Sequence, residues 1–208
     1  MERVLDVYKR PFNKDYPVVC MDESPKQLIA MKRGAIPMKP GHPKKIDVEY
    51  LRKGVVNIFI ANEPLAGKRF LQVTHTRKKQ DWARFIKRIC DEFYSNAKKI
   101  TLVMDNLSTH KPSSLYETFE PKEAKRIWDR FEFIYTPKHG SWLNMAEIEL
   151  HVLNGQCLNR HIDSMEEIQN EVAAWANHRN NQDSKINWRF TNDQARIKLR
   201  KLYPSLHE

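Results

Sequence analysis

Short apolar runs recur along the chain, and their lengths and spacing predict β-strands. Five of these runs have strand length and are bounded by polar or turn-forming residues: 18–21, 54–61, 69–75, 100–104 and 131–135. The run 100–104 is apolar throughout, as expected of a central strand that is covered on both faces. The short turn at 64–67 predicts that the second and third strands pair as an antiparallel hairpin.

The segments between and after these runs show the periodicity of helices. Apolar residues recur at three- and four-residue spacing, which predicts helices over 81–96, 121–130, 141–155, 165–179 and 192–202. Strands followed by helices in this order predict a mixed α/β sheet with helices packed on it. We expect residues 1–156 to form one compact domain and residues 157–208 to form a helical C-terminal extension packed on that domain.

Three acidic residues stand in largely apolar surroundings. Asp22 and Asp105 each end a predicted buried strand, and a buried carboxylate is costly unless it is paired or binds a cation. At 100° per residue, Glu149 lies about 160° from Glu147, toward the polar side of the helix 141–155. Glu147 shares the inward face with Leu143, Ala146 and Leu150. If Asp22, Asp105 and Glu147 converge, their oxygens form a site for Mg²⁺ or Mn²⁺.

The charge of the chain indicates a polyanionic partner. Its 208 residues carry a formal net charge of +10, and nucleic acid is the leading class of partner for such a surface. Between residues 26 and 53, eight basic residues face two acidic ones, and Lys44 and Lys45 lie in this stretch. No apolar run approaches the roughly 20 residues that span a bilayer. Three widely spaced cysteines favour a reducing compartment, so we expect a cytoplasmic protein without a membrane partner.

Three segments give these residues a family resemblance. They are MDE after the first strand, VMDNLSTHKP after the fourth, and YTPKHGSWLNMAEIEL leading into the helix 141–155. Together they resemble the catalytic segments of bacterial insertion-sequence transposases, in the mariner-related group with a DDE-superfamily endonuclease domain. The resemblance extends over essentially the whole chain, and SWLNMAE is its most specific segment.

The resemblance implies a ribonuclease-H-like (retroviral-integrase-like) fold. Its five-stranded sheet has three antiparallel strands and then two parallel ones, flanked by helices. In that family an acidic triad binds two divalent cations, Mg²⁺ or Mn²⁺. By position, the resemblance implies Asp22, Asp105 and Glu147 as the catalytic metal ligands, with Asp22 bridging both ions. The 41 residues between Asp105 and Glu147 exceed the usual spacing in mariner relatives, and the predicted helix 121–130 accommodates the extra length.

The implied activity is metal-dependent DNA cleavage and strand transfer at transposon ends. The implied partner is double-stranded DNA, both the terminal inverted repeats and a target containing a TA dinucleotide, and the family acts as dimers. The implied location is the bacterial cytoplasm, in association with the nucleoid. Family members normally begin with helix-turn-helix domains, for which there is no room before Asp22, so the chain resembles a catalytic domain alone.

Polar residues beside the predicted site have alternative interpretations. Asn106 and His110 either orient the phosphate or a metal-bound water, or satisfy backbone groups of their own loop. Lys111, Lys138 and His139 flank the site and are expected to contact the DNA backbone, as are Lys44 and Lys45 in the basic stretch.

Two further side chains are interpreted from their positions. Trp142 either stacks on a base or packs in the first turn of its helix. Glu23 follows Asp22 on an extended strand and therefore points to the opposite side, as a surface residue or as a partner in a salt bridge.

Two other functions remain open at this point. A related ribonuclease-H-like nuclease would cut DNA without joining strands, and the triad does not separate the two reactions because both use the same ions. A catalytically silent DNA-binding remnant of a decayed element would keep the fold and the basic surface without the chemistry.

Overall fold

Five strands form one mixed sheet in the order β3-β2-β1-β4-β5, and the computed structural model describes residues 1–32, 36–43 and 49–203. The strands are β1 (Val18–Met31), β2 (Tyr50–Glu63), β3 (Lys68–Thr74), β4 (Ile100–Met104) and β5 (Phe131–Tyr135). The pairs β1–β2 and β2–β3 are antiparallel, whereas β1–β4 and β4–β5 are parallel. The predicted fold class, with three antiparallel strands and then two parallel ones, is confirmed.

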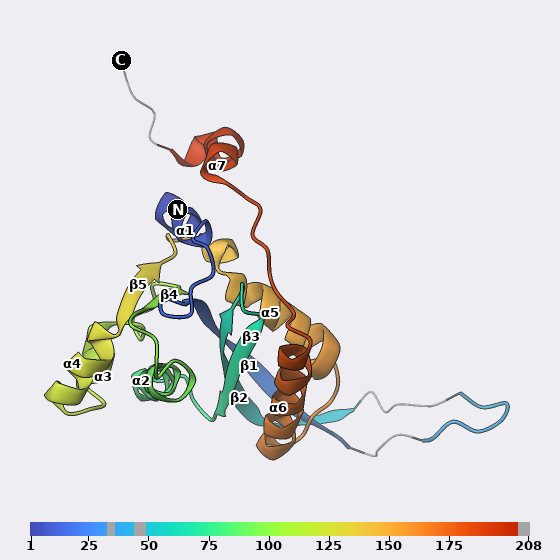
Figure 1. Ribbon diagram of the computed structural model, residues 1–208. Helices are drawn as coiled ribbons and strands as arrows, with labels where there is room; N and C mark the ends of the chain where they lie inside the picture. The colour runs from blue at the N-terminus through green and yellow to red at the C-terminus, as the bar shows by residue number, and fades with distance from the viewer. Residues whose placement is uncertain (33–35, 44–48, 204–208) are drawn as a thin grey trace.

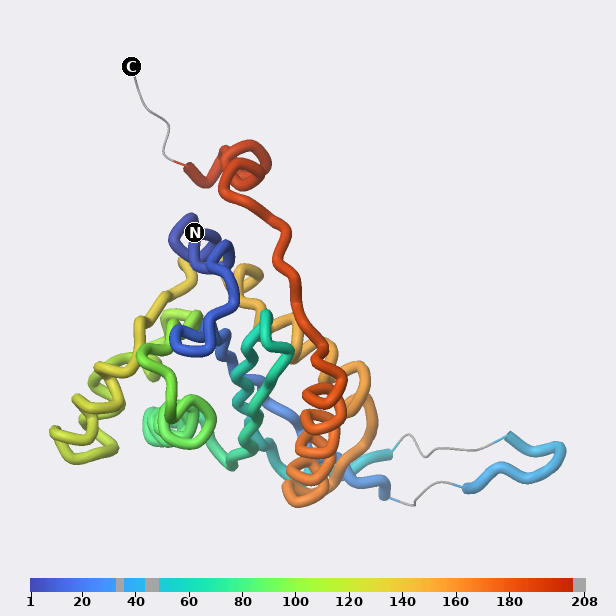
Figure 2. The backbone as a smooth tube through the Cα atoms, in the orientation of Figure 1, coloured from blue at the N-terminus to red at the C-terminus, as the bar shows by residue number. Residues whose placement is uncertain are grey.

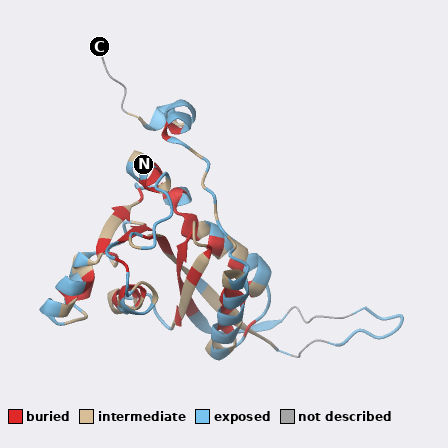
Figure 3. Cartoon of the chain, viewed as in Figure 1, coloured by how far each residue is buried: buried red, intermediate tan, exposed pale blue. Residues whose placement is uncertain are grey.

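Helices cover both faces of this sheet (Figure 1). They are α1 (Glu2–Tyr8), α2 (Lys79–Arg88), α3 (Pro112–Tyr116), α4 (Pro121–Asp129), α5 (Met145–Leu153), α6 (Met165–Asn181) and α7 (Asn192–Lys198). Helices α2, α3 and α4 contribute to one apolar cluster, and α1, α5, α6 and α7 contribute to the other. The sheet therefore separates two hydrophobic cores, and buried residues concentrate on it and on the inner helix faces (Figure 3).

The alternation of side chains along β1 assigns each residue to one core. Val19 and Met21 join the cluster on the α2 side, whereas Cys20 joins the cluster on the α5 side. Successive residues of a strand point to opposite faces, so Asp22 shares the α5 side with Cys20. Glu23 shares the α2 side with Met21.

The first strand is longer than its apolar run predicts. β1 continues past Asp22 to Met31, because its antiparallel pairing with β2 runs from Cys20 opposite Asn62 to Met31 opposite Tyr50. The expectation that Asp22 ends a strand is therefore wrong, although the parallel pairing with β4 does stop at Cys20. The resulting β1–β2 hairpin projects from the body of the molecule (Figure 2).

The helices also depart from their predicted bounds. The predicted helix 81–96 is α2 followed by a π-helical turn, Ile89–Phe93, and α3 was not predicted. The predicted helix 141–155 begins instead as a short 3₁₀ turn, Ser141–Leu143, and α5 starts at Met145 after the cap residue Asn144. No helix in the described part of the chain is long and apolar enough to cross a membrane.

The C-terminal residues pack on the rest of the chain. Helix α6 lies against β3, and buried residues of α6 and α7 belong to the same apolar cluster as Cys20 and Ile58. Helix α7 meets α1 through Asn192, whose amide donates to Asp6 (2.7 Å), and through Arg196, which pairs with Glu2 (2.8 Å). The division at residue 156 stays a prediction.

Candidate active site

Asp22 and Asp105 lie at the same level on adjacent parallel strands. The register pairs Cys20 of β1 with Val103 of β4, and each acid follows two residues after its paired residue. Asp105 is the first residue beyond β4, and 29% of its side chain is exposed. The topology thus brings together two of the three predicted site residues, which lie 83 positions apart in the sequence.

The Asp22 carboxylate lies in a partly buried and strongly acidic environment. Its Oδ1 accepts the backbone N–H of Glu23 (2.8 Å), and its Oδ2 accepts the side-chain amide of Asn144 (3.4 Å). Burial raises the pKa of Asp22 to about 7, and the charges of Asp105, Glu23 and Glu147 act in the same direction against the bond from Glu23 N–H. Glu147 is thereby close enough to Asp22 to affect its ionisation.

Glu147 occupies the first turn of α5 and is partly exposed, whereas Glu149 is buried. The expectation that Glu149 faces the polar side is wrong. Its carboxylate lies 2.9 Å from Arg69 and 3.0 Å from Arg179. Arg69 comes from β3 and Arg179 from α6. The Glu149 carboxylate can be buried on this side of the sheet because these two cations pair with it.

His110 lies between two carboxylates, one from each core side. Its Nε2 is 3.0 Å from Glu23 Oε2, and its Nδ1 is 2.6 Å from Asp105 Oδ1. Burial disfavours the charged ring, but the bonds to Asp105 and Glu23 outweigh it and raise the pKa of His110 to about 9. The ring also stacks on Trp82 of α2, with 5.6 Å between the ring centroids.

These contacts resolve the interpretation of Glu23. It points away from Asp22 as predicted, and of the two interpretations the salt-bridge partner is the correct one, since only 4% of its side chain is exposed. His110 itself contacts the side chains of two acids, besides a weak contact of 3.4 Å with the carbonyl of Asp105. Asn106 is exposed.

Comparison with known proteins gives this arrangement a family. Residues 17–169 match the family model described as DDE superfamily endonuclease. The chain belongs to the DDE superfamily endonucleases. The family predicted from its motifs is confirmed, and members of this family generally depend on divalent metal ions.

A solved structure shares the fold of this DDE endonuclease. It is the crystal structure of the Mos1 strand transfer complex, with a TM-score of 0.56 and 14% sequence identity, over 85% of this chain and 51% of that chain. The present chain therefore spans about half the length of the Mos1 chain. No match is found among curated proteins.

The donor chemistry of the candidate site fits a hard divalent cation. Asp22, Asp105 and Glu147 offer carboxylate oxygens alone, which suit Mg²⁺ and Mn²⁺. Burial is the main cause of the raised pKa of Asp22, and repulsion from the charges of Asp105 and Glu147 adds to it; a cation between these carboxylates would offset that repulsion. Within residues 1–32, 36–43 and 49–203, no three His, Cys, Asp or Glu side chains are gathered closely enough to enclose a metal ion as they stand.

The predicted DNA contacts lie on the surface where the structure describes them. Lys111, Lys138 and His139 are exposed, whereas Lys44 and Lys45 fall outside the described residues. His139 adopts a positive φ of 61°, and a Cβ on Gly140 would lie 2.5 Å from Pro137 Cγ. The chain therefore turns tightly between β5 and the helix that carries Glu147.

Trp142 lies directly after this turn, and 42% of it is exposed. Its ring meets Phe190 edge to face, with 5.8 Å between the centroids. Trp142 therefore packs on Phe190, as one of the two interpretations expects, and part of its ring remains exposed to solvent.

Asn144 was not singled out from the sequence. It is buried and caps α5, accepting the backbone N–H of Ala146 at 3.1 Å. An asparagine before a helical run is a common cap. The sequence predicts the helix to start at 141, which places Asn144 inside the helix and not at its cap.

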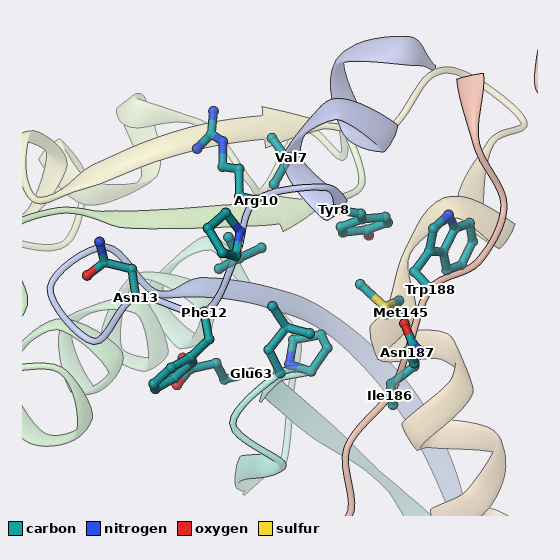
Figure 4. A pocket seen from close by; sticks show the side chains of 14 residues that line it. Val7, Tyr8, Arg10, Phe12, Asn13, Glu63, Met145, Ile186, Asn187 and Trp188 are labelled. Atoms are coloured by element: carbon teal, nitrogen blue, oxygen red, sulfur yellow. The ribbon is translucent and has the colours of Figure 1, made fainter. Parts of the chain in front are cut away.

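A small, partly open pocket lies on the same side of the sheet as α5, and its lining does not include the acids. Its volume is about 40 Å³, and its lining includes Tyr8, Met145 and Trp188 (Figure 4). The Tyr8 hydroxyl donates to the carbonyl of Leu143 (2.6 Å), and its ring packs at 5.2 Å from that of Trp188. None of the three carboxylates lines this pocket. Its contacts fasten α1 and the C-terminal segment to the turn before α5.

Proposed function

We propose that this chain is the catalytic domain of a mariner-related transposase, which cleaves DNA at transposon ends and transfers the cut strand to a target. The observation that carries the proposal is the placement of Asp22 beside Asp105, with the pKa of Asp22 raised in part by Asp105 and Glu147. Membership of the DDE superfamily endonucleases and the fold shared with the Mos1 chain support it.

In this proposal Asp22, Asp105 and Glu147 hold two Mg²⁺ or Mn²⁺ ions, with Asp22 shared between them. Such ions activate the attacking oxygen and stabilise the leaving oxygen of a phosphodiester. The carboxylates would hold these ions, and the ions would in turn hold the DNA phosphate for attack. The partly exposed positions of Asp105 and Glu147 leave this side of the site open to a DNA strand.

Basic residues around the opening would receive the DNA backbone. Lys111 follows the loop of Asp105, and Lys138 and His139 precede the helix of Glu147, so the exposed cations lie on the two segments that deliver the acids. Such contacts contribute affinity that depends on salt and not on sequence. Recognition of the terminal repeats and action as a dimer belong to the same proposal.

A cleavage assay tests the proposal. Labelled DNA that carries the terminal repeats of the element is incubated with the chain, with and without Mn²⁺. Glu147→Gln removes a proposed ligand, and Glu166→Gln removes an exposed carboxylate of α6 as the matched control. We expect Mn²⁺-dependent nicking and joining by the wild type and by Glu166→Gln, and a loss of at least 100-fold in Glu147→Gln.

Two other outcomes of this assay would support a different function, and a third would contradict the proposed site. Nicking without joining would support the nuclease interpretation. Salt-sensitive DNA binding without any cleavage would support a silent DNA-binding domain. Cleavage that survives in Glu147→Gln would contradict the proposed site.

A further inference from the structure

Asn144 contacts the two elements that carry Asp22 and Glu147. Its side-chain amide nitrogen donates to the carbonyl of Met21 (2.9 Å) and lies 3.4 Å from Asp22 Oδ2. Its side-chain oxygen accepts from Ala146 N, and its backbone carbonyl accepts from Glu147 N (3.1 Å). One residue therefore links the first proposed metal ligand to the backbone of the third.

These contacts do more than cap a helix. An N-cap needs one acceptor oxygen directed at the first turn, and serine, threonine or aspartate provides it as well as asparagine does. The donor nitrogen of Asn144 is directed the other way, across the α5–β1 interface. Only 1% of Asn144 is exposed, so water does not replace the donor if it is lost. Asparagine is the common capping residue that carries its acceptor and its donor on separate atoms, so Oδ1 can accept from α5 while Nδ2 donates across the interface.

The Asp22 carboxylate is held from two directions. Glu23 N–H donates to one oxygen at 2.8 Å, and Asn144 Nδ2 makes a longer contact of 3.4 Å with the other, and together they restrict rotation about the Cβ–Cγ bond. Each oxygen of a carboxylate has two lone pairs, so both oxygens keep acceptor capacity for a cation. Hydrogen bonds of this kind, made to a metal ligand by a neighbouring side chain, orient the ligand before the metal binds.

We propose that Asn144 is a positioning residue for the metal site, which orients the Asp22 carboxylate and sets its separation from Glu147. This inference rests on the proposed function, because it assumes that Asp22 and Glu147 are metal ligands. It goes beyond that function in assigning the α5 cap a role in metal affinity. Asn144 acts through Asp22 and does not itself touch the metal or the DNA.

Mn²⁺ binding tests the role without relying on catalysis. The intact chain is titrated with Mn²⁺ at pH 8, and free Mn²⁺ is followed by its electron paramagnetic resonance signal. Asn144→Ser keeps a capping oxygen but does not reach Met21 or Asp22, and Asn144→Thr is a second variant of the same kind with more volume. Ser164→Ala is the matched control, because it removes the cap that accepts Glu167 N at the start of α6.

We expect Asn144→Ser and Asn144→Thr to bind Mn²⁺ about tenfold or more weakly than the wild type, the size of effect typical for a residue that orients a ligand. Ser164→Ala should bind as the wild type does. The unfolding midpoint of Asn144→Ser should also fall, because the buried Met21 carbonyl loses its donor, and Ser164→Ala shows whether a loss of stability at a helix cap by itself weakens Mn²⁺ binding. Any variant that is unfolded by circular dichroism is set aside in favour of the other.

Two results would overturn the inference, and they differ in what else they overturn. If the wild type binds Mn²⁺, Glu147→Gln weakens that binding and both Asn144 variants match the wild type, then Asn144 is only a cap and the proposed site stands. If the wild type shows no saturable binding of Mn²⁺ in this titration, the proposed metal site is wrong, and the role of Asn144 is wrong with it.

Discussion

Arg69 of β3 and Glu149 of α5 form an ion pair of 2.9 Å in which each side chain is only 1% exposed. Arg69 also donates to the carbonyls of Gly67 and Ser184 and to the Asn180 side chain. The pair therefore joins the edge strand, the helix that carries Glu147 and the C-terminal segment. By anchoring Glu149 it fixes the rotation of α5 about its axis, and with it the position of Glu147 in the first turn of this helix.

Glu149→Ala should lower the free energy of unfolding by about 3–5 kcal/mol, because Arg69 is then left buried without its anion. Asp129→Ala, which breaks the exposed pair with Lys125, is the control and should cost less than about 1 kcal/mol. Urea unfolding measures both. Equal losses in the two variants would contradict the assignment of Glu149 to the core.

His110→Ala should destabilise the chain, because it leaves the buried Glu23 carboxylate without its partner and removes the ring that stacks on Trp82. Adding Glu23→Gln removes the stranded charge, so the double variant should be more stable than His110→Ala alone. A double-mutant cycle measures the coupling, which should exceed about 1 kcal/mol. Additive effects of the two changes would show that the contact carries no energy.

Asp22→Asn should stabilise the chain at pH 8 in the presence of a chelator. The folded pKa of Asp22, about 7, lies above the usual value for an aspartate, so the folded chain holds this proton more tightly than the unfolded chain does. Its contribution to stability is complete below about pH 4 and is lost as the pH rises through 7. The advantage of Asp22→Asn should therefore be of the order of 4 kcal/mol at pH 8 and small at pH 4, as thermal unfolding at the two pH values can measure. A constant advantage would contradict the raised pKa.

Lys138→Ala should weaken DNA binding at low salt and reduce the slope of log affinity against log salt by about 0.9, the loss of one phosphate contact. Lys99→Ala is the matched control, since Lys99 is exposed just before β4, at the opposite end of that strand from Asp105. Fluorescence anisotropy at several salt concentrations gives both slopes. Unequal slopes with the larger change in Lys99→Ala would place the DNA elsewhere.

The apolar runs predict the bounds of β4 and β5 well, and they underestimate the length of β1. Strands β4 and β5 have the bounds expected from 100–104 and 131–135, because short apolar runs between polar residues leave little choice of end. The apolar run of β1 stops at Met21 because residues 22–27 are polar or proline. The strand continues through them to the apolar residues 28–31 because its backbone pairs with β2.

The errors at the site have a common physical cause. The helical wheel assigns Glu149 to the polar side because it lies about 160° from Glu147, whereas its buried partner Arg69 is 80 positions away in the sequence. Asn144 was missed for a similar reason, because its contacts with Met21 and Asp22 span more than 120 positions. Long-range partners decide which polar residues are buried, and a single sequence does not show them.

The position of the metal tests the central claim most directly. Crystals of the chain soaked in Mn²⁺ give anomalous difference density at each bound ion. We predict peaks within about 2.0–2.3 Å of carboxylate oxygens of Asp22, with Asp105 and Glu147 completing the set. Mn²⁺ bound elsewhere, with no peak at Asp22, would contradict the account.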